Sequence, residues 1–298
     1  YLREVFNNKM EYFQNDQQQA SMTVTDPKTG DVIAQLGGRY DYELSGYNRA
    51  TQTSRSTGSS IKPILDYAPA VEYDNWGTNK VLDGSPYHYA GTNVTAYDYG
   101  GVTHGNSTLQ VALRNSYNTP ALRTLESVGE SKAKSTLQRF GMSLEGDLKP
   151  SYALGIDAST EQMASAFGAL GNDGVYRKPR YVDTITFSDG SSKKVEFETI
   201  QAVRPSTAFT LTSVLLGVPS SKGTMPNSDL TSEGIYAGVK TGTVAYDPSL
   251  NMGNVASDIW TVAYTKSVSM AIWEGYDIPN EQGIDEIALY NARQEMYK

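Results

Sequence analysis

The sequence has no cysteine and only two histidines, His88 and His104, among its 298 residues. Without cysteine there is no disulfide framework, no thiolate nucleophile and no zinc or iron–sulfur site with cysteine ligands. Two histidines cannot form a three-histidine metal site within one chain. We therefore expect no metal and no other cofactor, and covalent chemistry would fall to serine with lysine as the base.

A basic excess and a long apolar run are also missing. The chain carries 33 acidic and 25 basic side chains, a formal net charge of -8, which argues against a nucleic-acid-binding protein. No run approaches the roughly 18 consecutive apolar residues of a membrane span. The N-terminus, Tyr1-Leu2-Arg3-Glu4, has neither an initiator Met nor the apolar core of a signal peptide. We expect a soluble globular fragment of a longer protein.

Short β-like runs occur near both ends of the chain. Residues 22–25 and 31–36 form two such runs, and the turn residues Asp26-Pro27-Lys28-Thr29-Gly30 join them, which predicts a hairpin. Three more β-like runs lie at 235–239, 259–265 and 267–275. Strands at both ends around a helical middle predict an α+β fold, with an antiparallel sheet built from the two chain ends and an inserted, mostly helical region.

The middle of the chain has helical periodicity. Apolar residues recur at intervals of three or four in 109–117, 120–128, 131–140 and 160–170, and further helices are expected after Gly58 and at 205–218. Residues 73–106, rich in Gly, Asn, Tyr and Asp, are expected to form a long irregular excursion, and such loops are often functional. Residues 1–20 are polar and rich in amides, which is typical of a linker.

Common catalytic motifs are absent from the sequence, including Gly-x-Ser-x-Gly, the P-loop, His-Glu-x-x-His and Gly-x-Gly-x-x-Gly. What remains is a set of short patterns, each of which occurs more than once. Ser-x-x-Lys occurs at Ser59/Lys62, Ser131/Lys134 and Ser191/Lys194, Ser-x-Asn at Ser116/Asn118 and Ser249/Asn251, and Lys-Thr-Gly at Lys28 and Lys240. A single copy of any of these patterns indicates little by itself.

The surroundings separate the copies. Ser131/Lys134 falls inside a charged helix, Ser191/Lys194 in a polar hairpin tip, Lys28 in a turn and Ser249/Asn251 in a loop with Pro and Gly. The other copies border rigid elements: Ser59 begins a helix, Ser116-Tyr117-Asn118 ends one, and Lys240 ends a β run. Side chains at such places can face one cleft.

Ser59 and Lys62 can act together. Three residues apart on a helix, their side chains share one face and lie within hydrogen-bonding reach. Lys62 can deprotonate the Ser59 hydroxyl only when neutral, against a usual lysine pKa of about 10.4. Burial and a second cation, for which Lys240 is the candidate, both lower a lysine pKa. Because Pro63 disfavours α-helical backbone at the residue before it, we expect a tight 3₁₀-like first turn.

The remaining groups suit acyl transfer. Ser116 can relay a proton to a leaving amine, and Asn118 can bridge the lysine and a substrate amide. Thr241 and Thr243 offer hydroxyls to a substrate carboxylate, while Gly242 lets a substrate backbone lie against the strand. The backbone N–H groups of Thr243 and of the attacking serine can form an oxyanion hole.

Together the three patterns resemble a known family. Ser59-Ser60-Ile61-Lys62, Ser116-Tyr117-Asn118 and Lys240-Thr241-Gly242-Thr243 match, in order, the active-site motifs of penicillin-binding proteins and serine β-lactamases. The flanking sequence is similar to the transpeptidase domain of class A, high-molecular-mass penicillin-binding proteins of Gram-positive cocci such as streptococci. This similarity lies in 26–34, 47–50, 58–63 and 258–265, and it extends from about Met22 to Tyr276.

The resemblance implies the fold and the domain division. It implies a five-stranded antiparallel sheet flanked by helices. The predicted segments are a linker remnant at 1–20, the transpeptidase domain at 21–298 and a helical subdomain inserted at roughly 70–233. Proteins of this class also carry an N-terminal membrane anchor and a glycosyltransferase domain, neither of which is in this chain. The parent protein is therefore expected on the extracellular face of the cell membrane.

The resemblance also implies the activity, D,D-transpeptidation of peptidoglycan stem peptides. Ser59 would attack the penultimate D-Ala carbonyl, the terminal D-Ala would leave, and an amine of a neighbouring stem would accept the acyl group. Lys62 is the implied general base, Ser116 and Asn118 complete its proton network, and Lys240 with the two threonines beside it receives the substrate carboxylate. β-Lactam antibiotics would acylate the same serine and leave slowly.

Three alternatives share these residues. A class A β-lactamase needs a deacylating Glu, typically in a Glu-x-x-Leu-Asn loop. The nearest run is Glu145-Gly146-Asp147-Leu148-Lys149, and we interpret Glu145 as surface charge. A D,D-carboxypeptidase would pass the acyl group to water. A β-lactam-sensing receptor domain belongs to another functional class, because it would be acylated without turnover.

Several other residues have simpler expected roles. His88 and His104 are expected at structural positions or on the rim of the substrate site. Trp260 and Trp273 are expected to pack against the sheet. Most tyrosines of the excursion are expected to be half-buried surface aromatics, and a further hypothesis places Tyr97 and Tyr99 in the acceptor cleft.

Overall fold

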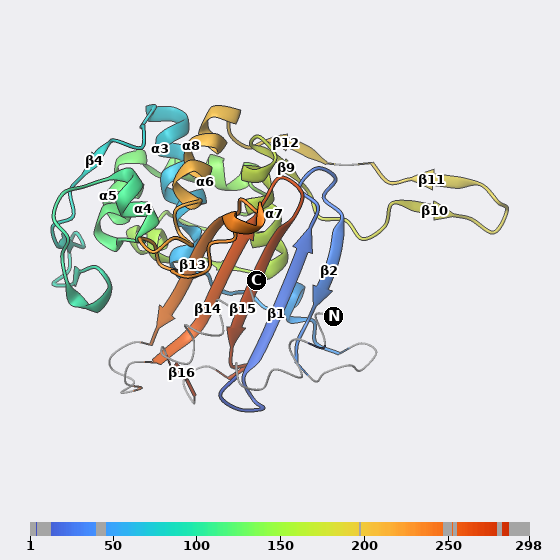
Figure 1. The fold of residues 1–298 in the computed structure, drawn as a ribbon, viewed down its shortest axis with the longest axis horizontal. Coiled ribbons are helices and arrows are strands. Elements are labelled where there is room, and N and C mark those ends of the chain that lie inside the picture. Colours follow the sequence, from blue (N-terminus) through green and yellow to red (C-terminus); the bar gives the residue numbers. More distant parts are fainter. Residues whose placement is uncertain are drawn as a thin grey trace.

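The computed structural model describes residues 4, 13–39, 46–196, 198–246, 252, 255–278 and 282–285. Its central element is an antiparallel sheet with the strand order β13-β14-β15-β1-β2, and β16 pairs with β14 (Figure 1). The strands are β1 (Gln19–Thr25), β2 (Val32–Leu36), β13 (Gly238–Ala245), β14 (Val255–Tyr264), β15 (Ser269–Gly275) and β16 (Ile284–Asp285). Because β1 pairs with β15, the sheet joins the two ends of the chain, as predicted.

Helices lie along the sheet and beside its β13 edge. They are α2 (Arg49–Gln52), α3 (Ala68–Asp74), α4 (Leu109–Arg114), α5 (Asn118–Val128), α6 (Glu130–Arg139), α7 (Thr160–Gly171) and α8 (Pro205–Leu215). Helix α7 packs on the central strands, where the Ser269 hydroxyl of β15 donates to the Ala164 carbonyl at 2.7 Å. Figure 1 shows α3, α4, α5, α6 and α8 grouped together on the side of β13.

Short elements complete the fold. The short helices are η2 (Gly58–Ile61), η3 (Pro63–Tyr67), η4 (Tyr99–Gly101), η5 (Pro150–Leu154) and η6 (Thr231–Glu233). The strand pairs are β3 (Arg55–Ser56) with β8 (Asp157–Ala158), β4 (Val81–Leu82) with β7 (Ser107–Thr108), β5 (Tyr87–His88) with β6 (Thr95–Ala96), β9 (Val175–Arg177) with β12 (Thr199–Gln201), and β10 (Thr184–Thr186) with β11 (Ser192–Lys194). The predicted excursion thus contains the β5–β6 pair and the strand β4, whose partner β7 directly follows the excursion. The β10–β11 hairpin projects from the body of the molecule (Figure 1).

Two predicted element boundaries are wrong, and both lie at the site. The strand predicted at 235–239 is β13, so Lys240 lies near the start of a strand and not at the end of one. Thr and Gly at 241–243 hide this strand from the hydrophobic pattern, because its packing against neighbours defines it. Asn118 begins α5 and does not end the preceding helix.

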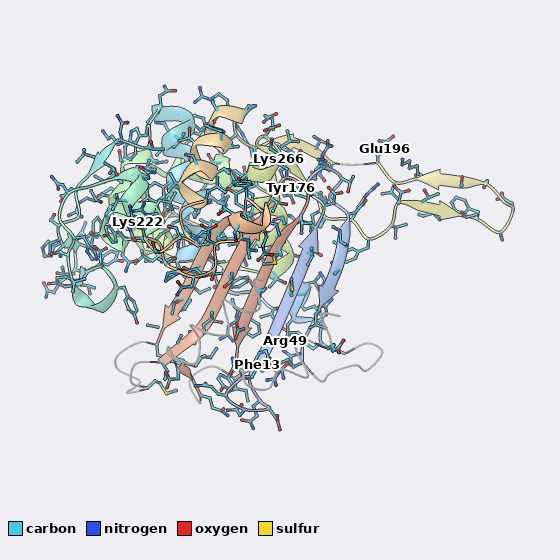
Figure 2. All side chains as sticks on the ribbon, in the orientation of Figure 1. Phe13, Arg49, Tyr176, Glu196, Lys222 and Lys266 are labelled. Atoms are coloured by element: carbon cyan, nitrogen blue, oxygen red, sulfur yellow. The ribbon has the colours of Figure 1, made fainter. Side chains whose placement is uncertain are left out.

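The sheet core is aromatic. Trp260 and Trp273 are each 1% exposed and pack within the sheet, as predicted. The indole N–H of Trp260 donates to the Ser56 carbonyl at 2.8 Å, which ties the segment before η2 to β14. Figure 2 labels Lys266, which lies in the tight connection between β14 and β15. Across the ranges that the structure describes, no helix is long and apolar enough to cross a membrane.

Candidate active site

Ser59 lies in η2, a 3₁₀ turn that leads into the π-helix η3. The backbone N–H of Lys62 donates to the Ser59 carbonyl, which is the hydrogen bond of a 3₁₀ turn. This confirms the tight turn expected from Pro63. The turn begins at Gly58 in left-handed backbone (φ +52°), where glycine is unstrained. π-Helical turns are rare and often occur at functional sites.

The serine turn lies directly on β13. A β-carbon on Gly242 would come within 2.3 Å of the Thr57 carbonyl oxygen, and one on Gly58 within 2.8 Å of that of Thr243. Glycine at both positions therefore allows the two backbones to approach closely. Gly242 thus has a role besides the predicted one of leaving room for a substrate backbone. The serine turn and Thr243 lie side by side, and the oxyanion role of their N–H groups stays a prediction.

Lys62 is fully buried beneath the serine turn. Its Nζ donates to the carbonyl oxygens of Ser116 (2.7 Å) and Tyr117 (3.1 Å) and to Oδ1 of Asn118 (2.8 Å). Burial, and not the predicted charge of Lys240, lowers its pKa from 10.5 to about 7. At neutral pH a large share of Lys62 is therefore the free amine, which is the form that a general base needs.

Ser116 connects the two lysines of the site. Its carbonyl oxygen accepts from Lys62, and its Oγ accepts from Nζ of Lys240 at 2.8 Å. Ser116 has left-handed backbone (φ +61°) between α4 and α5, a conformation that is strained for a residue other than glycine. The N–H groups of Ser116 and Tyr117 hold this turn by donating to carbonyl groups of α4. The turn directs the carbonyl of Ser116 to one lysine and its hydroxyl to the other.

Lys240 and Thr241 form the strand side of the site. Lys240 is fully buried, and its Nζ also donates to the Thr241 carbonyl at 2.8 Å. Oγ1 of Thr241 lies 2.8 Å from Oγ1 of Thr224, in the loop that follows α8 and also contains Lys222 (Figure 2). Thr224 was not predicted as a site residue, because nothing in the sequence pattern of that loop relates it to the strand.

Asn118 contacts Lys62 as predicted, and two residues of the excursion hold it in place. Oδ1 of Asp98 accepts from the backbone N–H groups of Asn118 (2.6 Å) and Thr119 (3.0 Å). Nδ2 of Asn118 donates to the Tyr97 carbonyl at 3.2 Å. Asp98 was missed because it lies 20 residues before Asn118, in a segment without periodicity.

A second missed carboxyl group lies four residues after Lys62. Asp66 is fully buried in η3, and neither of its carboxyl oxygens has a hydrogen-bond partner within the described residues. Burial raises its pKa well above the usual value, while the charge of Lys62 opposes that rise. An acidic residue inside an apolar helical run is the sequence signal that would have found it.

The Ser59 hydroxyl makes no hydrogen bond to Nζ of Lys62 within the described part of the chain. Its side chain is half-buried, and the three N–H bonds of the Lys62 ammonium go to the oxygens of 116–118. A neutral amine has two N–H groups and a lone pair. Loss of one proton therefore frees the nitrogen to accept from the Ser59 hydroxyl.

The other copies of the three patterns lie elsewhere. Lys134 on α6 pairs with Glu130, Ser131 is exposed, and Lys194 and Lys28 are exposed in a hairpin and a turn. Ser249-Leu250-Asn251 lies outside the described residues. The structure thus brings together Ser59, Lys62, Ser116, Asn118 and Lys240–Thr243, and none of the duplicates that it describes.

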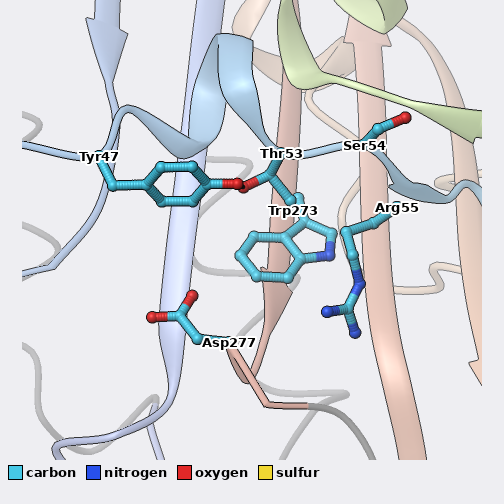
Figure 3. Close-up of a pocket in the computed structure, with 6 residues that line it drawn as sticks. All are labelled: Tyr47, Thr53, Ser54, Arg55, Trp273 and Asp277. Carbon is cyan, nitrogen blue, oxygen red and sulfur yellow. The ribbon is translucent and has the colours of Figure 1, made fainter.

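A cavity of about 400 Å³ lies away from these residues and is lined by Tyr47, Thr53, Ser54, Arg55, Trp273 and Asp277 (Figure 3). Its charged groups are already paired: Arg55 with Asp258 at 2.7 Å and Asp277 with Arg49 at 2.5 Å. The Tyr47 hydroxyl donates to the Gln52 carbonyl.

The two histidines and Glu145 take the predicted peripheral positions. His104 is exposed, and its ring stacks on that of Tyr117, with centroids 4.0 Å apart. His88 is exposed in β5, where Nδ1 lies 2.8 Å from the Thr95 hydroxyl. Glu145 is exposed after α6. The described residues contain no group of three or more His, Asp or Glu side chains placed to hold a metal ion.

Comparison with known sequences identifies the family. The model of the penicillin binding protein transpeptidase domain matches residues 20–273. The chain is 39% identical to penicillin-binding protein 1A of Streptococcus oralis over 292 residues, covering 89% of this chain and 44% of the relative. It is 34% identical to penicillin-binding protein 1A/1B of Bacillus subtilis over 277 residues, covering 89% of this chain and 30% of the relative. The chain thus spans less than half the length of these relatives.

Solved structures agree on the fold. PonA1 from Mycobacterium tuberculosis superimposes with a TM-score of 0.82 at 20% identity, covering 99% of this chain and 80% of that one. Its complex with penicillin V gives a TM-score of 0.80 at 21% identity, covering 97% and 79%. The chain belongs to the penicillin-binding protein transpeptidase family. The predicted α+β fold and the resemblance to class A proteins of the streptococcal type are confirmed.

Proposed function

We propose that this chain is the catalytic domain of a serine D,D-transpeptidase. It cross-links peptidoglycan stem peptides through a Ser59 acyl-enzyme and is acylated and inhibited by β-lactam antibiotics. The observation that carries the proposal is the buried series of contacts Lys62–Ser116–Lys240 beside the serine turn. A lysine whose pKa burial lowers, a hydroxyl relay and a cation are the groups that acyl transfer at a serine requires, and these contacts therefore support the proposal.

In the acylation step, Ser59 Oγ attacks the carbonyl carbon of the penultimate D-Ala, and its proton passes to the free amine of Lys62. The peptide C–N bond then breaks. The departing D-Ala amine takes this proton from Lys62, relayed through the Ser116 hydroxyl that Lys240 holds at 2.8 Å, so that Lys62 is again neutral. Lys240, with the hydroxyls of Thr241 and Thr243, receives the carboxylate of the substrate.

In the second step, an amine of a neighbouring stem peptide attacks the ester carbon of the acyl-enzyme. The amine gives a proton to Lys62, the C–O bond to Ser59 breaks, and the serine regains its proton. With a β-lactam, attack opens the ring and forms the same ester, but the leaving amine stays tethered to the acyl group. The site then remains blocked, which is why inhibition follows from the same chemistry.

Acylation by a fluorescent penicillin, read by intact mass, tests the proposal. We expect one adduct on Ser59 that is lost in Ser59→Ala and kept in Ser131→Ala, the matched serine of the α6 copy. Absence of any adduct on the wild type would overturn the proposal.

Turnover measurements separate the remaining alternatives. Slow release of the adduct excludes a β-lactamase. Cleavage of a D-Ala-releasing peptide excludes a sensor domain that is acylated without turnover. An added amine that captures the acyl group separates a transpeptidase from a carboxypeptidase, which transfers the acyl group only to water.

We also propose that this domain belongs to a longer protein anchored in the cell membrane. Its relatives are more than twice as long as the matched part, which supports a parent protein with a membrane anchor and a glycosyltransferase domain outside this chain. The site would then lie on the extracellular face of the membrane, where peptidoglycan is assembled. Within the chain, the proposed division is a linker at 1–20, the transpeptidase domain at 21–298 and a helical insertion at roughly 70–233.

A further inference from the structure

Three contacts connect the excursion to the second motif of the site. The carboxylate of Asp98 accepts from the backbone N–H groups at the start of α5. The carbonyl of Tyr97 accepts from Nδ2 of Asn118 at 3.2 Å. The ring of His104 stacks on that of Tyr117, with the two planes 8° apart. One segment thus contacts the motif through its backbone, its amide side chain and its aromatic ring.

Asp98 occupies a closed turn within the excursion. The backbone N–H of Asp98 donates to the Val102 carbonyl at 3.0 Å, and the N–H of Gly101 donates to the Asp98 carbonyl at 3.0 Å. Gly100 and Gly101 have left-handed backbone (φ +77° and +73°), which glycine adopts without strain. Asp98 is only 4% exposed. The turn therefore presents a buried carboxylate to α5 in one defined position.

Asp98 is separated from Lys62 by one residue, Asn118. The carboxylate fixes the backbone N–H of Asn118 at 2.6 Å, and Oδ1 of Asn118 accepts from Nζ of Lys62 at 2.8 Å. The second carboxylate oxygen of Asp98 is buried and has no hydrogen-bond partner in the described residues. Asp98 therefore fixes an acceptor of Lys62 and also places a negative charge near it.

We propose that Asp98 is a positioning residue of the acylation reaction, which holds Asn118 against Lys62 and acts on Lys62 through its charge. This inference rests on the proposed function, because the role is exerted on the base that deprotonates Ser59. Burial lowers the pKa of Lys62, and the charges of Asp66 and then of Asp98 raise it again. Asp98 therefore limits how far burial lowers the pKa, and with it the pH at which acylation begins.

The groups around Lys62 allow this effect to be isolated. The buried residues of α3, α5 and α6, which pack against η3, are all uncharged. The ionisable groups that face Lys62 or its contacts are Asp66 and Tyr67 on η3, Asp98 in the excursion, Tyr117 before α5 and Lys240 on β13. Of these, Asp98 alone combines a charge with a contact to Asn118.

Asp98→Asn separates the charge from the hydrogen bonds. Its side-chain oxygen can still accept from α5, so we expect the acylation rate at high pH to stay within about 3-fold of wild type. Without the charge, the acid limb of the pH profile is expected to move about half a pH unit or more to lower pH. Asp98→Asn is then acylated faster than wild type below pH 6. Structural damage alone would not produce such a gain.

Asp98→Ala removes the charge and the acceptor together. Loss of a hydrogen bond to a charged group is expected to lower the high-pH rate about 10-fold to 100-fold. Asp83→Asn is the matched control, because Asp83 is an exposed aspartate of the same excursion that pairs with Arg123 on α5. Its pH profile is expected to equal that of wild type.

The measurement is the second-order rate constant for acylation of Ser59 by a fluorescent penicillin from pH 5 to pH 9, with thermal melts of every variant. The inference would be overturned if the acid limb of the pH profile of Asp98→Asn lay at the same pH as that of wild type. It would also be overturned if the acylation rate of Asp98→Ala at high pH equalled that of wild type. If Asp98→Ala does not fold, the acid limb of Asp98→Asn decides. If wild type itself gives no adduct on Ser59, the proposed function fails first, and the inference fails with it.

Discussion

Lys62 and Lys134 each end a Ser-x-x-Lys pattern, but their surroundings differ. Lys62 is fully buried and donates to three uncharged oxygens, whereas the side chain of Lys134 is 26% exposed and pairs with the Glu130 carboxylate. Burial favours the free amine of a lysine, and it lowers the pKa of Lys62 to about 7. The contrast teaches that surroundings, and not the spacing of the pattern, turn a lysine into a base.

The two Lys-Thr-Gly copies also differ in the surroundings of their glycines. Gly242 lies in β13, where its lack of a side chain lets the serine turn approach the strand. Gly30 lies in the turn between β1 and β2 with left-handed backbone (φ +78°). Both positions require glycine, one for the geometry of the site and the other for a turn distant from it.

Lys62→Met should show the largest effect. Methionine keeps the volume and the burial of the side chain but has no basic nitrogen, so acylation of Ser59 is expected to slow by about 1000-fold. Lys134→Met removes the same group from the same pattern, and its acylation rate is expected to equal that of wild type. The check is the acylation rate constant at pH 8 for both variants, after thermal melts show that both are folded.

Either variant can break the comparison. Near-wild-type acylation in Lys62→Met would place the base on another residue. A large loss in a folded Lys134→Met variant would mean that the exposed copy on α6 takes part in the reaction.

Gly242→Ala should show the next largest effect. The new β-carbon would meet the Thr57 carbonyl oxygen at 2.3 Å, so the serine turn must move away from β13. A displacement of about 1 Å at a reacting group can cost about 100-fold in rate, and we expect a loss of that order in acylation. Gly30→Ala would place a β-carbon within 2.5 Å of the Lys178 carbonyl oxygen, in addition to a left-handed backbone that costs about 1 to 2 kcal/mol. We expect a loss of stability of at least that size, with an unchanged acylation rate.

Acylation kinetics of the two glycine variants measure the expected difference in rate, and urea unfolding measures their stabilities. A Gly242→Ala variant that is less stable but fully active would show that the close approach of the two backbones serves the fold alone.

Much of the fold could be predicted from the sequence, because local patterns specify it. The hairpin of β1 and β2 follows from two β-like runs around Asp26–Gly30, and α7 begins with the reciprocal capping of Ser159 and Gln162. β13 was misplaced for a physical reason. Its central residues are Thr and Gly, and the strand forms because η2 and β14 pack on either side of it.

The site could be predicted only where its residues form a short pattern. Ser59, Ser116 and Lys240 each belong to one, so their meeting in one place could be expected. Asp98 and Thr224 belong to none, since each reaches the site through a contact between distant segments. Burial of both lysines is likewise a property of the packed structure, which no spacing in the sequence reveals.

The smallest expected effects concern two acidic residues, Asp66 four residues after Lys62 and Glu130 four residues before Lys134. Asp66 is buried without a hydrogen-bond partner in the described chain, and burial raises its pKa. The folded state thus keeps this proton while the unfolded state loses it, so stability falls as pH rises above the usual aspartate pKa. Asp66→Asn removes that loss. It should match wild type near pH 4 and have a higher free energy of unfolding and a higher melting temperature than wild type at pH 7.5.

Glu130 is expected to change stability with pH in the opposite direction, because its hydrogen bond with Lys134 lowers its pKa. Its contribution to stability is present above the usual glutamate pKa and is lost as pH falls through the lowered one. Glu130→Gln should therefore be slightly less stable than wild type at pH 7.5, and the difference should vanish at acid pH. Thermal melts of both variants from pH 4 to pH 8 check the two signs. Parallel curves for Asp66→Asn and wild type would show that the buried carboxyl does not resist ionisation, and the contrast between the two lysine sites would then be limited to the lysines themselves.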